Sequence, residues 1–226
     1  MHYTSLKTHT QWDIIQLAMA KKSNIELGMT TNRIETLTDG VFAIAMTLLV
    51  LNLKFPQPSQ YIGGFLHKIL QSQIHIFINY ILSFIILGIF WIMHHQQSHY
   101  IRRTDRIHLW INIFMLMFIA LIPFSTSLVS NFTKDWVDEI FFAGNIFIIG
   151  TLFYANWSYA TYKCRLVEPK TDKVLIDIGK RRVLVVPLIA LFAIITAFQK
   201  IELSSYCYML IPIILAFPAF RYQTHD

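Results

Sequence analysis

Residues 33–54 read RIETLTDGVFAIAMTLLVLNLK, and this stretch decides the class of the protein. From Gly40 to Leu53 it carries no charge. Asp39 stands one turn inside the hydrophobic region, behind Arg33 and Glu35. A carboxylate close to lipid is costly and is usually paired within the protein. The stretch therefore predicts a membrane helix whose first turns belong to a functional site or a structural network.

The composition of the whole chain is also that of a membrane protein. Of its 226 residues, 55% are apolar and only 14% are charged, which is unlike an ordinary soluble domain. About 20 apolar residues span a bilayer as a helix. Six segments qualify, at 36–53, 74–95, 109–129, 140–162, 183–198 and 206–220. The last two are short and contain prolines, which neighbouring helices accommodate in a membrane. We therefore predict an all-α membrane protein with six transmembrane helices.

The basic residues are unevenly distributed around these segments. If the N-terminus is cytoplasmic, fifteen of the nineteen lysines and arginines lie on the cytoplasmic side. This is the positive-inside bias of an even-spanning protein with both termini inside, so the net charge of +6 reports topology and not a nucleic-acid partner. We predict a cytoplasmic N-terminal extension (1–32), a six-span domain (33–221) and a cytoplasmic tail (222–226). The extension shows no cleavable signal peptide, and a short helix at 12–20 is one interpretation of it.

Two cysteines and one long loop complete this organisation. Cys164 and Cys207 fall at opposite ends of their spans, so we expect no disulfide between them. Neither cysteine has the spacing of a metal site. The 163–182 loop is basic, and we interpret it as a solvated cytoplasmic segment that fixes orientation.

A helical wheel of the first span separates two faces. One stripe is apolar except for a single hydroxyl, and it consists of Ile44, Thr47, Leu48 and Leu51. Asp39 falls on the opposite face. We expect it to point into the helix bundle of its own subunit, because lipid would not tolerate it. From the wheel alone the stripe could face lipid, another helix or a narrow pore, and lipid or packing is the commoner arrangement.

The second span ends in WIMHHQQSHY, which places polar groups at the same depth as Asp39. Trp91, His94, His95 and Ser98 share one helical face, and buried polar groups need partners. Three interpretations compete: a structural clamp, a protonatable gate or relay, and a metal site joined by His99. The metal interpretation is weak because later spans offer no His, Asp or Glu inside the membrane, which also argues against a metalloenzyme.

The remaining spans carry polar groups that we interpret structurally. Pro123, with Ser125, Thr126 and Ser127 after it, predicts a kink whose freed backbone groups are satisfied by hydroxyls. Asn145 and Asn156 lie on one face of the fourth span and are expected to bond between helices. The sequence has no TVGYG-like filter segment, nucleophile elbow or P-loop. We therefore predict that the protein is not an enzyme and has no catalytic residue, metal or cofactor.

Three motifs resemble the endosomal/lysosomal potassium channel family and its prokaryotic relatives. They are residues 33–51 (RIETLTDGVFAIAMTLLVL), 91–95 (WIMHH) and 120–126 (ALIPFST). The family signature is usually Phe-Ser-Asp, where this chain has Leu37, Thr38 and Asp39. The hydroxyl and the carboxylate are kept and the ring is lost. The resemblance covers roughly residues 33–126.

This resemblance implies six spans per subunit and a homotetramer whose first helices line a central pore. It makes Ile44, Leu48 and Leu51 the hydrophobic constriction, with Thr47 as a hydroxyl layer beside them. It also implies a signature network of Arg33, Thr38, Asp39, Trp91, His94 and His95. The expected function is a potassium-preferring cation channel of the cell membrane without a carbonyl filter, whose partners are potassium ions, the bilayer and copies of itself. The alternatives are a proton-coupled transporter with an Asp/His relay and an intramembrane enzyme.

Overall fold

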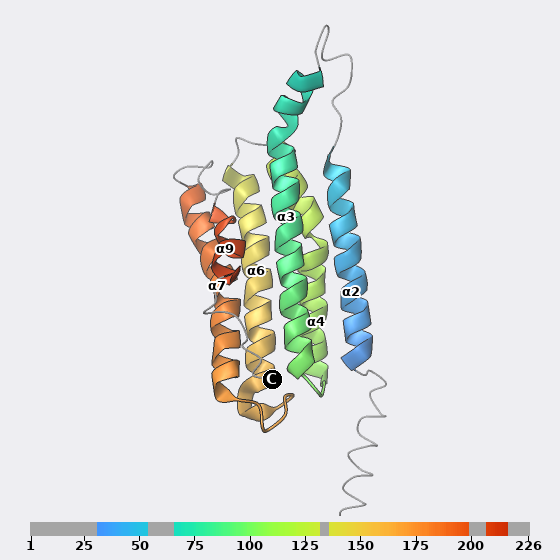
Figure 1. Ribbon diagram of the computed structural model, residues 1–226, viewed down its shortest axis with the longest axis vertical. Helices are drawn as coiled ribbons and strands as arrows, with labels where there is room; N and C mark the ends of the chain where they lie inside the picture. The colour runs from blue at the N-terminus through green and yellow to red at the C-terminus, as the bar shows by residue number, and fades with distance from the viewer. Residues whose placement is uncertain (1–30, 54–65, 132–135, 199–206, 217–226) are drawn as a thin grey trace, which may run out of the picture.

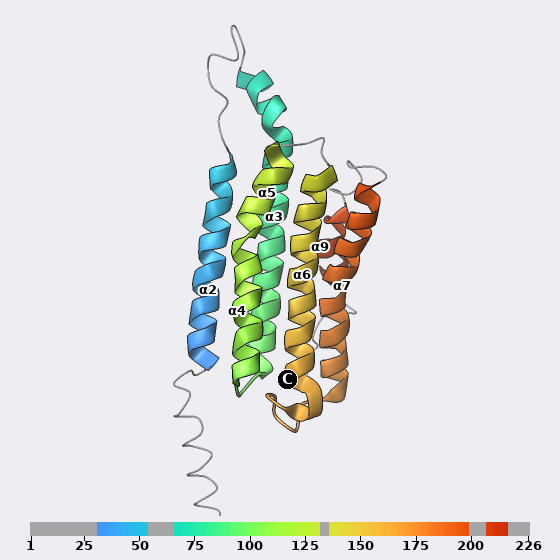
Figure 2. The same cartoon turned by 180° about the vertical axis from the view of Figure 1, so that it is seen from behind.

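The computed structural model describes residues 31–53, 66–131, 136–198 and 207–216, and their secondary structure is helical apart from short connections. The long helices run side by side along one axis (Figures 1 and 2). In chain order the elements are α2 (Thr31–Leu48), η1 (Leu49–Asn52), α3 (Leu66–Tyr100), α4 (Arg106–Ala120), α5 (Ile122–Asn131), α6 (Trp136–Thr161), η3 (Tyr162–Cys164), α7 (Lys173–Ala197) and α9 (Leu210–Ala216). The predicted all-α class is confirmed. The helix expected at 12–20 and the 222–226 tail lie outside the described residues.

Among the residues that the structure describes, four stretches of helix are long and apolar enough to cross a membrane. They are Thr31–Asn52, Gln73–Tyr100, Arg106–Ser130 and Trp136–Cys164, and they contain nearly all of the first four predicted segments. Each begins one to five residues before the predicted segment, because polar residues continue the helix beyond its apolar part. Of the sixth predicted segment, residues 207–216 are described, and they include the short helix α9.

The prediction of a solvated loop at 163–182 is wrong in its second half. Helix α7 begins at Lys173, well before the predicted fifth span. Asp172 caps it, since its Oδ1 accepts a hydrogen bond of 2.9 Å from the backbone N–H of Val174. An N-cap carboxylate satisfies a backbone N–H group that has no partner within the helix, and this local signal sets the helix start ahead of the apolar run. Cys164 and Cys207 are both free, as predicted.

Helix α2 lies at the edge of the bundle, beside α3 and α4 (Figures 1 and 2). One of its faces is buried against the subunit, through Ile34, Thr38, Phe42, Ala45 and, in η1, Leu49. These residues recur at helical spacing, so the opposite face of α2 points away from the bundle. The fold thus gives the first helix one packed face and one face without partners inside the subunit.

The predicted kink around Pro123 is confirmed. Helix α4 ends at Ala120 and α5 begins at Ile122, because a proline nitrogen has no N–H to continue the hydrogen-bond ladder. The hydroxyls of Ser125 and Thr126 donate to the carbonyl oxygen of Ile122 at 3.0 and 2.9 Å. The carbonyl oxygen of Pro123 accepts a 3.0 Å bond from Asn52 Nδ2, which ties the end of the first span to the kink.

Helices α6 and α7 pack closely where small residues meet large ones. A Cβ added at Gly150 would lie 2.7 Å from Pro187 Cδ, and one at Gly179 would lie 2.7 Å from Trp157 Nε1. The Trp157 indole also donates to the carbonyl of Ile176 at 3.1 Å. Close backbone approach of this kind is how helices associate within a membrane. The α6–α7 pair therefore forms a scaffold on the side of the bundle away from α2 (Figure 1).

Candidate functional site

The apolar stripe predicted on the first span lies on the outward face of α2. Ile44 is 61% exposed, Leu48 41% and Leu51 65% in the isolated subunit. Thr47 lies among them and is also exposed. Its hydroxyl donates to the carbonyl oxygen of Ile44 at 2.9 Å. A hydroxyl that donates to its own helix keeps its oxygen lone pairs for a second partner, so Thr47 presents an acceptor within an otherwise apolar surface.

Asp39 lies on the surface of the isolated subunit, which differs from the expectation that it points into the bundle. Its Oδ1 accepts a 2.9 Å hydrogen bond from Trp91 Nε1 of α3, and Trp91 is itself 40% exposed. The indole ring stacks on His95 with 5.9 Å between ring centroids. The Asp39 carboxylate thus binds Trp91 at the edge of the contact between α2 and α3. The positions of α2 that face the bundle are occupied by Thr38 and Phe42.

His94 points to a different face of α3 from His95 and is buried. Its Nε2 is 3.1 Å from Asn112 Oδ1 of α4, and its Nδ1 is 3.4 Å from the Ser98 hydroxyl. The structure therefore divides the predicted network into a surface part with Asp39 and Trp91 and an interior part around His94. This division follows from the spacing of adjacent residues, which point in directions about 100° apart on a helix.

The other two members of the predicted network lie on α2. Thr38 is fully buried, and its hydroxyl has no hydrogen-bond partner among the described residues. Arg33 is exposed at the start of the helix. Glu35 lines a small interior cavity together with His94 and Ser98. The start of α2 therefore contacts the interior part of the network as well as the surface part.

The interior network continues from α3 through α4 to α6. Asn112 Nδ2 lies 2.8 Å from the carbonyl oxygen of His108, 3.2 Å from His108 Nε2 and 3.3 Å from Asn156 Oδ1. Asn156 Nδ2 donates to Gln97 Oε1 at 2.9 Å, and Gln97 Nε2 donates to the carbonyl oxygen of Phe153 at 3.2 Å. Each of these polar side chains is buried. Hydrogen bonds of this kind satisfy groups that lipid and apolar side chains cannot.

Residues 33–123 match the protein family described as the endosomal/lysosomal potassium channel TMEM175. The chain is 31% identical over 184 residues to a potassium channel of Chamaesiphon minutus, an alignment that covers 80% of this chain and 91% of the relative. It is 32% identical over 146 residues to a potassium channel of Streptomyces collinus, covering 63% of this chain and 70% of the relative. This chain belongs to the TMEM175 family.

A solved structure agrees with this assignment. The crystal structure of a lysosomal potassium-selective channel TMEM175 homolog from Chamaesiphon minutus superposes with a TM-score of 0.75 and 29% sequence identity. The superposition covers 84% of this chain and 97% of the homolog. The TMEM175 fold therefore extends over α6 and α7, beyond the residues 33–123 of the family match.

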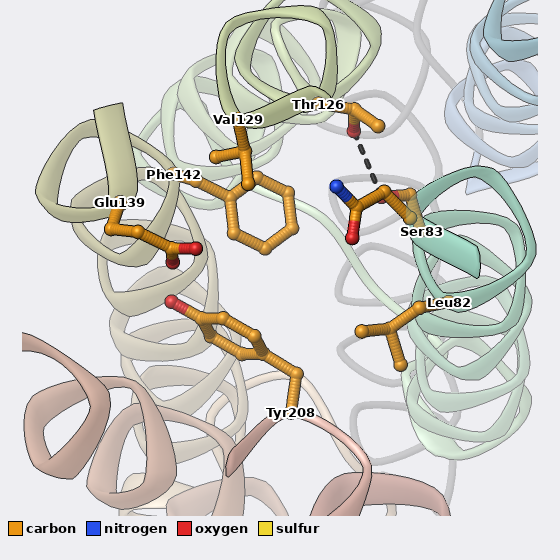
Figure 3. Close-up of a pocket in the computed structure, with 8 residues that line it drawn as sticks. Leu82, Ser83, Thr126, Val129, Glu139, Phe142 and Tyr208 are labelled. Carbon is orange, nitrogen blue, oxygen red and sulfur yellow. Dashed lines mark hydrogen bonds between the residues drawn. The ribbon is translucent and has the colours of Figure 1, made fainter. Parts of the chain in front are cut away.

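Two buried ionisable residues lie next to the predicted third and fourth spans. His108 lies in the first turn of α4 and Glu139 in the first turn of α6, each just before the predicted span. Figure 3 shows the Glu139 carboxylate and the Tyr208 hydroxyl turned toward one another in a small cavity, beyond which the Thr126 and Ser83 hydroxyl oxygens lie 2.9 Å apart. Helices that begin before their apolar run carry these groups into the bundle.

The predicted interhelical role of the two asparagines of α6 is confirmed. Asn145 Nδ2 donates to the Ser125 hydroxyl of α5 at 3.3 Å, and Asn156 bonds to α3 and α4 as described above. Sequence reasoning missed Gln97, His108 and Asn112. The signal was the i, i+4 spacing of His108 and Asn112, which puts two polar groups on one face of an apolar helix.

The described residues also bear on the metal interpretation. No three His, Cys, Asp or Glu side chains within residues 31–53, 66–131, 136–198 and 207–216 are arranged to hold one metal ion. His95 and His99 are exposed on successive turns of α3, whereas His94 is held by Asn112. The histidines of this TMEM175 chain are therefore distributed among different partners.

Proposed function

We propose that this TMEM175 family member is a potassium-preferring cation channel of the cell membrane, in which four copies of the chain surround a central pore. The related proteins of Chamaesiphon minutus and Streptomyces collinus are named as potassium channels. The homolog with a TM-score of 0.75 is described as potassium-selective. In the proposed assembly each subunit has six spans with both termini cytoplasmic, and α2 of each subunit faces the axis.

The observation that carries the pore assignment is the asymmetry of α2. Its packed face is buried in the subunit, while Ile44, Leu48 and Leu51 remain exposed. No charged residue occurs between Gly40 and Leu53. Four such faces around an axis would form rings of branched apolar side chains. Hydrophobic rings of this kind close a pore by excluding water from it.

Ion preference in such a pore has a physical basis without a carbonyl filter. Potassium holds its water shell less tightly than sodium does. Removing part of that shell at a constriction therefore costs less free energy for potassium than for sodium. Thr47 adds an oxygen acceptor on the stripe between Ile44 and Leu51. That oxygen would replace one lost water for the permeant ion. We infer that selectivity is modest and that the pore opens when the α2 helices rotate or move apart.

The decisive experiment is electrical. Purified protein in a planar bilayer under a potassium gradient should give unitary currents. Their reversal potential should be shifted from zero toward the potassium equilibrium potential. Turnover-limited uptake without unitary current would instead favour the proton-coupled transporter, with Asp39 and the histidines as its relay. Absence of both current and uptake in correctly assembled protein would contradict the channel and the transporter alike. The intramembrane enzyme would then be the remaining alternative.

A matched pair of variants tests whether the stripe is the constriction. Leu51 on η1 is 65% exposed and Leu188 on α7 is 61% exposed in the isolated subunit. Both truncations to alanine remove the same apolar volume from an unpacked surface. Leu51→Ala should raise the single-channel conductance because it widens a ring, and Leu188→Ala should leave it unchanged. Equal conductance for the two variants would place the constriction elsewhere.

A further inference from the structure

Asn112 holds two buried histidines at once, and its orientation is fixed by a backbone group. Its Nδ2 lies 2.8 Å from the carbonyl oxygen of His108, which can only accept a hydrogen bond. Its Oδ1 must therefore face His94 Nε2 at 3.1 Å. At the far end of the network, Gln97 Nε2 is fixed in the same way by the carbonyl oxygen of Phe153. The backbone carbonyls of His108 and Phe153 thus determine the positions of the amide oxygen and nitrogen in the side chains between them, which are those of Asn112, Asn156 and Gln97.

This direction determines where each histidine carries its proton. His94 has to donate from Nε2, because it faces the oxygen of Asn112. His108 has to accept at Nε2, because it faces the amide nitrogen of Asn112 at 3.2 Å. The proton of His108 then lies on Nδ1, which is 3.0 Å from the Thr104 hydroxyl. The contact with Asn112 therefore requires a neutral His108 with its proton on Nδ1, whereas His94 can donate from Nε2 whether it is neutral or charged.

We propose that His108 Nε2 is a proton-binding site and that a proton bound there opens the joint between α4 and helices α3 and α6. Protonation places an N–H group opposite the N–H of Asn112 at a separation of 3.2 Å. Turning the Asn112 amide over would relieve that contact. The turned amide would lose its bonds to the His108 carbonyl and to Asn156 Oδ1, and it would put its nitrogen against the donating Nε2 of His94. No orientation of Asn112 satisfies all of its neighbours once His108 is charged.

Burial disfavours a charge on His108, but the surroundings supply a route for the proton and carboxylates that offset part of that cost. A cavity lined by Glu35, Ser98, His94, His108 and Asn112 reaches into the network. It shares Glu35 and Ser98 with a larger polar cleft at the ends of α2 and α3. The charged or titratable groups that face the two histidines are Glu35 and Asp39 from α2, His95 from α3, Asp105 before α4, and Tyr159 of α6 through its 2.6 Å bond to Asp105. Three of these are carboxylates, and carboxylates stabilise an imidazolium.

The same cavity connects the proton site to the first helix. Thr31, Ile34 and Glu35 of α2 line it opposite His108. Opening the α4 joint therefore changes the support beneath the start of α2. This inference concerns the isolated subunit and stands independently of what the assembled protein conducts. Its test therefore has readouts that do not depend on current.

The experiment is a histidine-resolved nitrogen NMR titration of the full-length protein in detergent, from about pH 8 to about pH 4. At the upper end His108 should carry its proton on Nδ1 and His94 on Nε2. As the pH falls, His108 should take up a proton. Amide exchange in the first turns of α4 should accelerate over the same range, by about fivefold for each hydrogen bond lost. Identical tautomers at the upper end, or His108 protonation without faster exchange in α4, would overturn the proposal.

Three variants separate this site from general acid effects. His108→Gln should abolish the change in exchange, because glutamine does not titrate. Asn112→Asp offers an acceptor to both imidazoles and should raise the midpoint by about 1 to 3 pH units. His75→Gln, on an exposed histidine of α3, should behave as the native chain. If His108→Gln fails to fold, the Asn112→Asp midpoint alone decides, and an unchanged midpoint there would refute the assignment.

Discussion

A single added methyl group on α6 tests how closely α6 packs against α7. Gly150→Ala places a Cβ 2.7 Å from Pro187 Cδ and 3.0 Å from Pro187 N. Carbon atoms prefer about 3.5–4.0 Å, so α6 and α7 must separate by nearly 1 Å at this point, and the proline ring cannot turn aside. Overpacking of this kind costs about 1–3 kcal/mol. Replacing glycine by alanine within a helix returns about 0.5–1 kcal/mol.

The matched control lies on the same helix. Gly144→Ala meets nothing within 4 Å, so it has the helix gain without the clash. The free energy of unfolding can be measured by denaturing-detergent titration of the purified protein. It should be lower for Gly150→Ala than for Gly144→Ala by about 1–3 kcal/mol. Single-channel conductance should be the same for both, because α6 lies away from α2 (Figure 2). Equal stability of the two variants would mean that α7 moves aside freely, and the close packing argued here would be wrong.

Three further predictions concern α2. Thr47→Val should shift the bi-ionic potassium/sodium reversal potential toward non-selectivity by the equivalent of about 1 kcal/mol. The control is Thr151→Val, because Thr151 is an exposed threonine on α6 whose hydroxyl also donates to a carbonyl of its own helix. A native reversal potential for Thr47→Val would mean that selectivity depends on the width of the pore alone. Ile44→Ala should raise single-channel conductance, and unchanged conductance in intact tetramers would remove Ile44 from the constriction. Asp39→Leu and Trp91→Phe each remove the same 2.9 Å bond, so each should lower the yield of the proposed tetramer on size exclusion and the double variant should lower it no further. Additive losses would show that the two residues act separately.

The apolar pattern was sufficient to predict most of the fold. Four predicted spans coincide with four long helices because an uncharged run of that length has one stable arrangement in lipid. The kink at Pro123 followed from the missing N–H group. The start of α7 did not follow, since the polar residues after Asp172 read as a loop. Their helix depends on a cap and on packing against α6, neither of which a hydropathy pattern records.

The site was predictable in part. The wheel placed the apolar stripe opposite the packed face because both depend only on the helical repeat. The partners of the histidines were not predictable, since His94 and His95 are adjacent in sequence and face different helices. Which of them meets α4 depends on how α3 is rotated in the bundle. That rotation is set by the whole core, including buried residues such as Phe90 and Phe153, which stack at 5.4 Å.

The distribution of polar contacts along the first span suggests how the proposed pore could open at low cost. Near its start, Asp39 accepts from Trp91, and at its end Asn52 donates to the Pro123 carbonyl. The two points are about 20 Å apart along a helix. Between them the packed face is formed by the apolar side chains of Phe42 and Ala45. Apolar contacts can slide without leaving a buried donor or acceptor unpaired, whereas breaking either polar contact costs a hydrogen bond. The polar contacts therefore hold the span at its two ends, and between them a rotation that turned Ile44 and Leu48 into or out of the axis of the proposed pore would break no side-chain hydrogen bond to another helix.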